Sequence, residues 1–253
     1  MAALTGMGSG RYAMTSSAFI HSAVLFLLCT VVGNAAEPAR LYRTNQVEGW
    51  TVMVNRNLDT SEQATTDHAF DLLRVQLQEI VRVVPAPAVS RLREVRLWFS
   101  PEYPGIPPRA EYHPGTDWLR EHGRNPAMAK GVEFTNIRIF AAETRRMPNF
   151  TLHELAHSYH DRVLRDGFEN QPIRLAYTKA KAGGTYDRVQ RRDADGNLRW
   201  DRAYAMTDPM EYFAESTEAF FSRNDFFPFD RAELERHDPE MARLLTELWR
   251  VGR

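Results

Sequence analysis

Hydrophobic residues recur along the chain at two spacings, and each spacing predicts a kind of element. A repeat of 3.6 residues places side chains on one face of a helix. Such a repeat runs up to Pro85, following a potential capping box at residues 60–63, and its members are Phe70, Leu73, Leu77, Ile80 and Val84. A second repeat predicts a C-terminal helix through Met241, Leu244, Leu245, Leu248 and Val251.

Shorter runs of β-branched and aromatic residues predict strands, which we expect at residues 50–54, 95–99 and 132–140. Further helices are expected at residues 149–166, 171–182 and 208–223. Segments 186–191 and 198–204 flank a Gly-containing acidic link and predict a β-hairpin. That link matches a calcium loop only in part, so a plain turn is the favoured interpretation.

These elements form one unbroken series without repeats or low-complexity linkers. We therefore predict a single α+β domain over residues 37–253, with a small mixed sheet.

The N-terminus carries an apolar run at residues 18–32, followed by small residues. This run is short for a membrane-spanning helix and is typical of a signal peptide, which we place at residues 1–36. An uncleaved anchor or a membrane-docked helix is the alternative. Cys29, the only cysteine, would leave with the signal. We therefore expect an exported protein, secreted or in the periplasm or cell envelope, with no membrane span in the mature chain.

Charge adds little to this picture. The chain has 32 basic and 33 acidic side chains and a formal net charge of -1. This balance produces no field that would recruit nucleic acid or an anionic membrane. We therefore expect no nucleic-acid partner.

Residues 151–157 read TLHELAH and contain the pattern His-Glu-x-x-His. Residues four apart lie on one face of a helix, so His153 and His157 can bind one tetrahedral zinc ion and leave a side open. Beside them, Glu154 can take a proton from zinc-bound water and pass it to the leaving amine of a peptide. The alternative is that Thr151 and Glu154 only form a capping box.

A third ligand is needed to complete such a site. His160 lies about 10 Å along the helix from His153, which favours a supporting or surface role. Position 163, where the metzincin pattern has a histidine, is Val163. A carboxylate therefore remains as the candidate third ligand. Glu211 and Glu215 lie four apart near the start of a helix, and either can bind zinc while the other supports a ligand histidine. Asp208 and Glu211 could equally be only a helix cap.

Together with Tyr204, which lies seven residues before Glu211, these motifs resemble gluzincin-type zinc metallopeptidases. They are similar to the catalytic domain of anthrax lethal factor and to the clostridial Pro-Pro endopeptidases, over residues 151–221. The resemblance implies one Zn²⁺ per chain, with ligands His153, His157 and Glu211. It also implies Glu154 as general base, Tyr204 as a hydroxyl that stabilises the oxyanion or leaving group, and Glu215 as a carboxylate supporting the ligands.

The resemblance further implies a zincin-like fold in which the strand at 132–140 borders the cleft and pairs with an extended peptide. We therefore expect a zinc-dependent peptidase with a protein or peptide substrate. One rival is a catalytically inactive zinc-containing binding protein of the envelope on the same scaffold. The other is a domain without metal whose histidines are incidental.

Three other features leave two interpretations each. The aromatic and proline-rich segment 98–118 is either a packed loop, which we favour, or a substrate-contacting one. Phenylalanines between 220 and 229 are interpreted as core or as a loop plug. Residues 149–151 fit a glycosylation sequon that abuts the motif helix.

Overall fold

A computed structural model describes residues 41–252 of the chain. The predicted signal peptide and Cys29 lie outside these residues, so the export of the protein stays a prediction. Within the described range, no helix combines the length and the hydrophobicity needed to cross a membrane.

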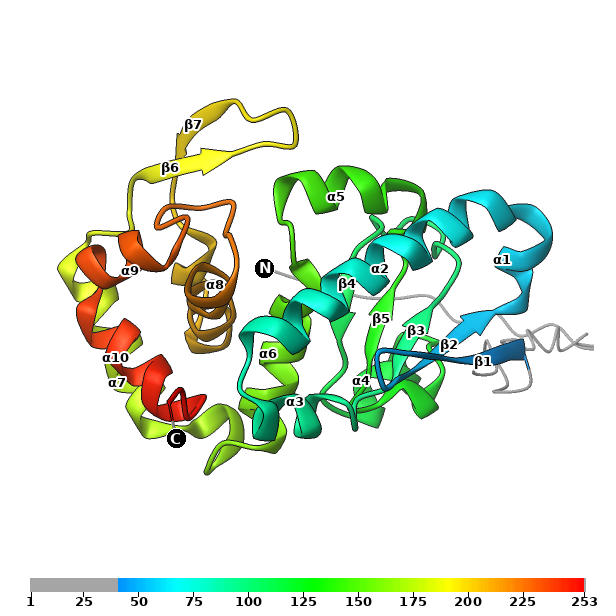
Figure 1. Cartoon of the computed structure of the whole chain (residues 1–253), viewed down its shortest axis with the longest axis horizontal. Coiled ribbons are helices and arrows are strands. Elements are labelled where there is room, and N and C mark those ends of the chain that lie inside the picture. The colour runs from blue at the N-terminus through cyan, green and yellow to red at the C-terminus, as the bar shows by residue number, and fades with distance from the viewer. Residues whose placement is uncertain (1–40, 253) are drawn as a thin grey trace, which may run out of the picture. The chain divides into compact units, whose positions relative to one another are not determined.

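The described residues form a mixed α+β structure around a small mixed sheet (Figure 1). Its strands are β1 (Tyr42–Val47), β2 (Trp50–Asn55), β3 (Leu97–Phe99), β4 (Ala110–Tyr112) and β5 (Val132–Phe134). They lie in the order β1-β2-β3-β5-β4. The three central strands are parallel, and the two outer strands, β1 and β4, are antiparallel to their neighbours.

Alternation along the strands divides the buried side chains between the two faces of the sheet. Leu97 and Phe99 join the main core, to which α2 contributes Leu73, Leu77 and Ile80. Trp98 points to the other face and packs in a smaller cluster with Leu119 of α4. The helices of this part are α1 (Arg56–Ser61), α2 (Gln63–Val83), α3 (Ala86–Leu92), α4 (Thr116–Glu121), α5 (Phe140–Arg146) and α6 (Phe150–Arg162).

The rest of the chain is mainly helical. Its elements are α7 (Gln171–Gly183), the hairpin β6 (Val189–Arg192) and β7 (Leu198–Asp201), α8 (Pro209–Phe221), α9 (Arg231–His237) and α10 (Pro239–Leu248). Helix α8 packs directly against α6 (Figure 1). This contact joins the part of the chain that contains the five-stranded sheet to the part that follows α6.

Two expectations about strands and helices were wrong. The strand predicted at 132–140 ends at Phe134, and the chain turns into α5 from Phe140. The reason is that good helix formers follow Phe140, whose ring packs on Phe134 and Phe150. The capping box at residues 60–63 does not form, because the Thr60 hydroxyl bonds the carbonyl of Asn57 within α1.

The strand that borders the cleft is β4, and not the predicted strand at 132–140. Residues 132–134 of that predicted strand form β5, which lies between β3 and β4 inside the sheet. Sheet order depends on contacts between distant segments, which periodicity alone does not contain. The acidic link of the hairpin is a turn in which both carboxylate oxygens of Asp193 accept hydrogen bonds from Asp195 and Asn197.

Candidate metal centre

The start of α6 is fixed by polar side chains that lie before and beside it. Asn149 is the N-cap, and its side chain accepts a hydrogen bond from the amide of Leu152. Its Nδ2 donates to the carbonyl of Gln76 in α2, whose own side chain accepts from the amide of Thr151. Thr151 therefore lies inside the helix, and the alternative capping box of Thr151 and Glu154 is not formed. Asn149 is also buried, so the sequon offers no free amide.

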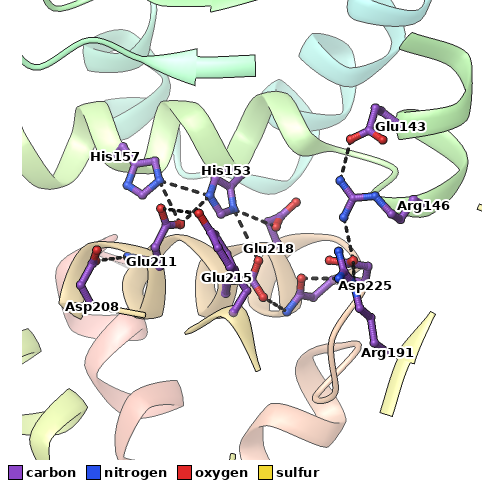
Figure 2. Close-up of polar contacts among 12 residues, drawn as sticks. Glu143, Arg146, His153, His157, Arg191, Asp208, Glu211, Glu215, Glu218 and Asp225 are labelled. Carbon is purple, nitrogen blue, oxygen red and sulfur yellow. Dashed lines mark hydrogen bonds and ion pairs between the residues drawn. The ribbon is translucent and has the colours of Figure 1, made fainter. Parts of the chain in front are cut away.

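Helix α8 begins with a cap of its own. The Asp208 carboxylate accepts from the amides of Met210 and Glu211, and Pro209 occupies the first turn. Glu211 does not close the cap with its side chain. Instead its carboxylate points toward α6 (Figure 2).

Three side chains from these two helices converge on one point (Figure 2). The Nε2 atoms of His153 and His157 lie 3.1 Å apart. Oε2 of Glu211 lies 3.1 Å from His153 Nε2 and 3.4 Å from His157 Nε2. The structure thus brings together the three residues expected as zinc ligands.

This triangle fits a tetrahedral zinc ion. Bonds of about 2.0–2.1 Å at tetrahedral angles place neighbouring ligand atoms roughly 3.3 Å apart. The three observed separations of 3.1, 3.1 and 3.4 Å scatter around that value. Two imidazoles and a carboxylate are also a donor set that zinc takes in catalytic sites, where a fourth position stays open.

His153 is held from its other side by Glu218. Its Nδ1 lies 3.0 Å from Oε2 of Glu218, which is fully buried. When Nδ1 carries the proton and donates it to a carboxylate, Nε2 is left as the metal ligand. The nearest oxygen of Glu215 lies 3.9 Å from the same Nδ1, and Glu215 accepts a hydrogen bond from Asn224. Glu218 therefore occupies the supporting position expected for Glu215.

His153, Glu215 and Glu218 form a second group whose ligand atoms lie within 4.8 Å of one another. One imidazole serves both groups, through Nε2 in the first and Nδ1 in the second. A single proton on Nδ1 satisfies the contact with Glu218, so we interpret these two carboxylates as supports for His153.

Burial and hydrogen bonding shift the pKa values of His153 and Glu211 in opposite directions. Burial lowers the pKa of His153, but hydrogen bonds with Glu211 and Glu218 outweigh it and raise that pKa well above its ordinary value. Burial raises the pKa of Glu211, but hydrogen bonds from both histidines outweigh it and lower that pKa. A metal ion bound at this point would compete with protons for the nitrogens of His153.

Glu154 and Tyr204 lie beside the triangle and line the same cleft of about 490 Å³. Oε2 of Glu154 accepts a hydrogen bond of 2.8 Å from the amide of Tyr112 in β4. Tyr204 begins a 3₁₀ turn after β7, and its hydroxyl donates to Oε1 of Glu211 at 3.3 Å. Burial and the charge of Glu211 raise the pKa of Tyr204 to about 12, so the hydroxyl stays a donor at neutral pH.

An ionic network bridges the cleft at the end beside His153 (Figure 2). Arg146 of α5 bonds Glu143 and, across the cleft, Oδ2 of Asp225, at 2.6 Å each. Arg191 of β6 contacts the same oxygen at 2.9 Å. Asp225 is buried, so the two arginines neutralise a carboxylate that water does not reach.

His160 has neither of the roles expected for it. It is fully buried between the rings of Phe168 and Phe213, and neither ring nitrogen has a hydrogen-bond partner in the described part of the chain. Burial lowers the pKa of His160 to about 4. It is a neutral core residue.

Segment 98–118 is partly a packed loop and partly a wall of the cleft. Tyr103 donates to the buried carboxylate of Glu133, whereas Pro108, Tyr112 and Pro114 line the cleft. Among the phenylalanines between 220 and 229, Phe220 and Phe226 are buried. Phe226 also lines the cleft.

Sequence reasoning missed two residues of the site. Glu218 lies two helical turns after Glu211, a spacing that places both on one face and could have pointed to it. Tyr112 contributes a backbone amide, and no residue type signals that contribution. Comparison of the chain with models of known families, with characterised proteins and with solved structures found no match, so the chemistry of the site is inferred from its own residues.

Proposed function

We propose that the protein is a zinc-dependent peptidase of the zincin-like, gluzincin type, with one zinc ion held by His153, His157 and Glu211. The observation that carries the proposal is the convergence of these three side chains at separations suited to one tetrahedral ion. The capping alternative for Glu154 loses its support because Asn149 caps the helix. A domain whose histidines are incidental would not require the buried Glu218 behind His153.

When bound, zinc would supply a Lewis acid that lowers the pKa of a water molecule in the cleft. Glu154 takes a proton from that water and returns it to the leaving amine. The Tyr204 hydroxyl donates a hydrogen bond to the oxygen that gains negative charge. Glu218 keeps the proton of His153 on Nδ1 and so fixes the orientation of the ring.

The substrate proposed is an extended segment of a protein or peptide. Strand β4 is one of the two outer strands of the sheet and lines the cleft beside Glu154. An extended chain can add to such an edge through backbone hydrogen bonds.

The test is the zinc content of the purified protein together with hydrolysis of a mixed peptide library. We expect about one zinc per chain, because the three side chains form a single tetrahedral site. We expect turnover to fall about 10²–10⁴-fold in Glu154→Gln, which removes the general base and keeps the metal ligands. Zinc without turnover would favour the inactive binding protein, and absence of zinc would refute the metal site.

The ligand assignment has its own test. Glu211→Ala removes a ligand and is expected to abolish zinc binding, whereas Glu215→Ala is expected to retain it. Loss of zinc only in the Glu215 variant would transfer the ligand role to Glu215.

A further inference from the structure

Strand β4 is short and pairs with β5 along one edge. Arg109 and His113, which flank β4, direct their backbone groups to the side of β5 and bond Thr135 and residues 130–131, which flank β5. Ring Nε2 of His113 also lies 3.0 Å from the buried carboxylate of Glu133. These bonds leave the strand one free edge.

Backbone groups alternate in direction along an antiparallel strand. Since Arg109 and His113 point to β5, the amides of Ala110 and Tyr112 point outward. The outward amide of Tyr112 is the one that donates to Oε2 of Glu154, at 2.8 Å. The free edge of the sheet therefore ends on the carboxylate that the proposed reaction uses as base.

The side chain of Tyr112 adds a second attachment to the same helix. Its hydroxyl donates to Oδ2 of Asp161 at 2.6 Å, and Tyr112 is only 7% exposed. Asp161 lies seven residues after Glu154, which is two turns along α6. Tyr112 thus spans two turns of α6, because its amide bonds Glu154 and its hydroxyl bonds Asp161.

We propose that Tyr112 and Asp161 are positioning residues that hold Glu154 by docking the edge strand onto α6. With Oε2 bound to a fixed amide, Oε1 is left for the proton of water. A peptide that pairs with the remaining outer edge of β4, at Ala110, is then aligned with the base by the same strand. This inference rests on the proposed function for its catalytic consequence but not for the contact itself.

The contact can be tested without turnover, through exchange of the Tyr112 amide. Labelling the nine tyrosines with ¹⁵N gives few enough signals to resolve, and the signal that Tyr112→Phe removes is that of Tyr112. Glu154→Ala is expected to speed its exchange about tenfold to a hundredfold, as loss of a hydrogen bond to a charged acceptor requires. Glu154→Gln, which keeps an acceptor oxygen, is the matched control. Equal exchange in wild type and Glu154→Ala would overturn the inference.

The catalytic consequence is tested by kinetics. Tyr112→Phe and Asp161→Ala are expected to lower kcat about tenfold, the value of one such hydrogen bond, with KM and zinc content unchanged. Asp161→Asn keeps an acceptor and should restore most of the loss. Lys130→Met removes the other partner of Asp161, at 2.6 Å, and should leave kcat unchanged.

The outcomes separate the two proposals. A kcat for Tyr112→Phe equal to that of wild type would overturn the positioning role. A wild-type protein that protects the Tyr112 amide but shows no turnover would refute the peptidase and support the docking of Glu154 on β4.

Discussion

At the scale of single residues, the ring of His153 makes a different polar contact through each of its two nitrogens. Its Nε2 faces His157 and Glu211, while its Nδ1 faces Glu218 (Figure 2). The side chain is only 7% exposed. The properties of the proposed metal centre would therefore depend on Glu218 as well as on the three proposed ligands.

This dependence gives a prediction for Glu218. Glu218→Ala is expected to weaken zinc binding about 10–100-fold, the usual cost of losing the partner that orients a ligand histidine. Competition with a chelator of known affinity measures it. Glu215→Ala is the matched control, since its oxygen lies 3.9 Å from the same nitrogen, and an equal loss in both variants would contradict the assignment.

His160 gives a prediction about pH. Its pKa is about 4 in the folded protein and about 6.5 when unfolded, so below pH 6.5 the unfolded chain binds more protons. Stability from a neutral His160 is present above pH 6.5 and is lost as pH falls toward 4. The full difference amounts to about 3 kcal/mol.

We expect His160→Leu to remove this loss. Its free energy of unfolding, measured in urea on metal-free protein, should exceed the wild-type value by a margin that grows from pH 7 to pH 4. His68→Leu, at an exposed position, controls for loss of an imidazole. A margin that stays constant with pH would show that His160 does not titrate in this way.

The residues of the site differ in how far the sequence could predict them. His153, Glu154 and His157 share a helix whose period alone sets their relative directions. Predicting Glu211 as a ligand required a second helix, and a capping role together with Asp208 explained the same sequence equally well. In the structure Asp208 caps the helix, and the Glu211 carboxylate contacts His153 instead. The contact of the Tyr112 amide with Glu154 could not be predicted, because it depends on the position of β4 at the edge of the sheet.

At the scale of elements, α6 is held at its N-terminus by Asn149 and by Gln76 of α2. These bonds satisfy amides that a helix leaves unpaired at its start. They also link α6, which carries two of the proposed zinc ligands, to α2, which packs across the sheet. The position of α6 is therefore set by the core rather than by α6 alone.

Asn149→Ala is accordingly expected to lower the free energy of unfolding by about 1–3 kcal/mol, since it removes both the cap of α6 and the hydrogen bond to the carbonyl of Gln76. It should also weaken zinc binding. Asn170→Ala removes the corresponding cap of α7 and serves as the control. It should lower stability without changing zinc affinity, and an equal effect of both variants on zinc binding would contradict the specific role of Asn149.

Elements with a strong hydrophobic period were predictable, and those set by distant contacts were not. The face of α2 that contains Leu73, Leu77 and Ile80 is buried as its spacing predicted. The prediction of a strand after Phe134 was wrong, because Ile137 and Ile139 suggested a strand where they form a 3₁₀ turn that leads into α5. Ile137 is buried in the core, whereas Ile139 is 39% exposed and contributes little to it.

At the scale of the whole described structure, the site joins two segments far apart in the sequence. His153 and His157 lie on α6, and Glu211 lies on α8, fifty-odd residues later by the numbering. Arg146 and Asp225 make a second bridge between α5 and the loop after α8. A metal ion bound by both helices would add a link that the unfolded chain lacks.

Zinc should therefore stabilise the fold by mass action. At a free zinc concentration of 100 times Kd, the free energy of unfolding is expected to rise by about 2.7 kcal/mol. Urea titrations with buffered zinc and with chelator measure this rise. Glu211→Ala should abolish it, because α8 then supplies no ligand, whereas Glu121→Ala, at an exposed position, should leave it intact. If Glu211→Ala kept the full zinc-dependent rise, the two histidines or another group would hold the metal, and α8 would not take part in the link.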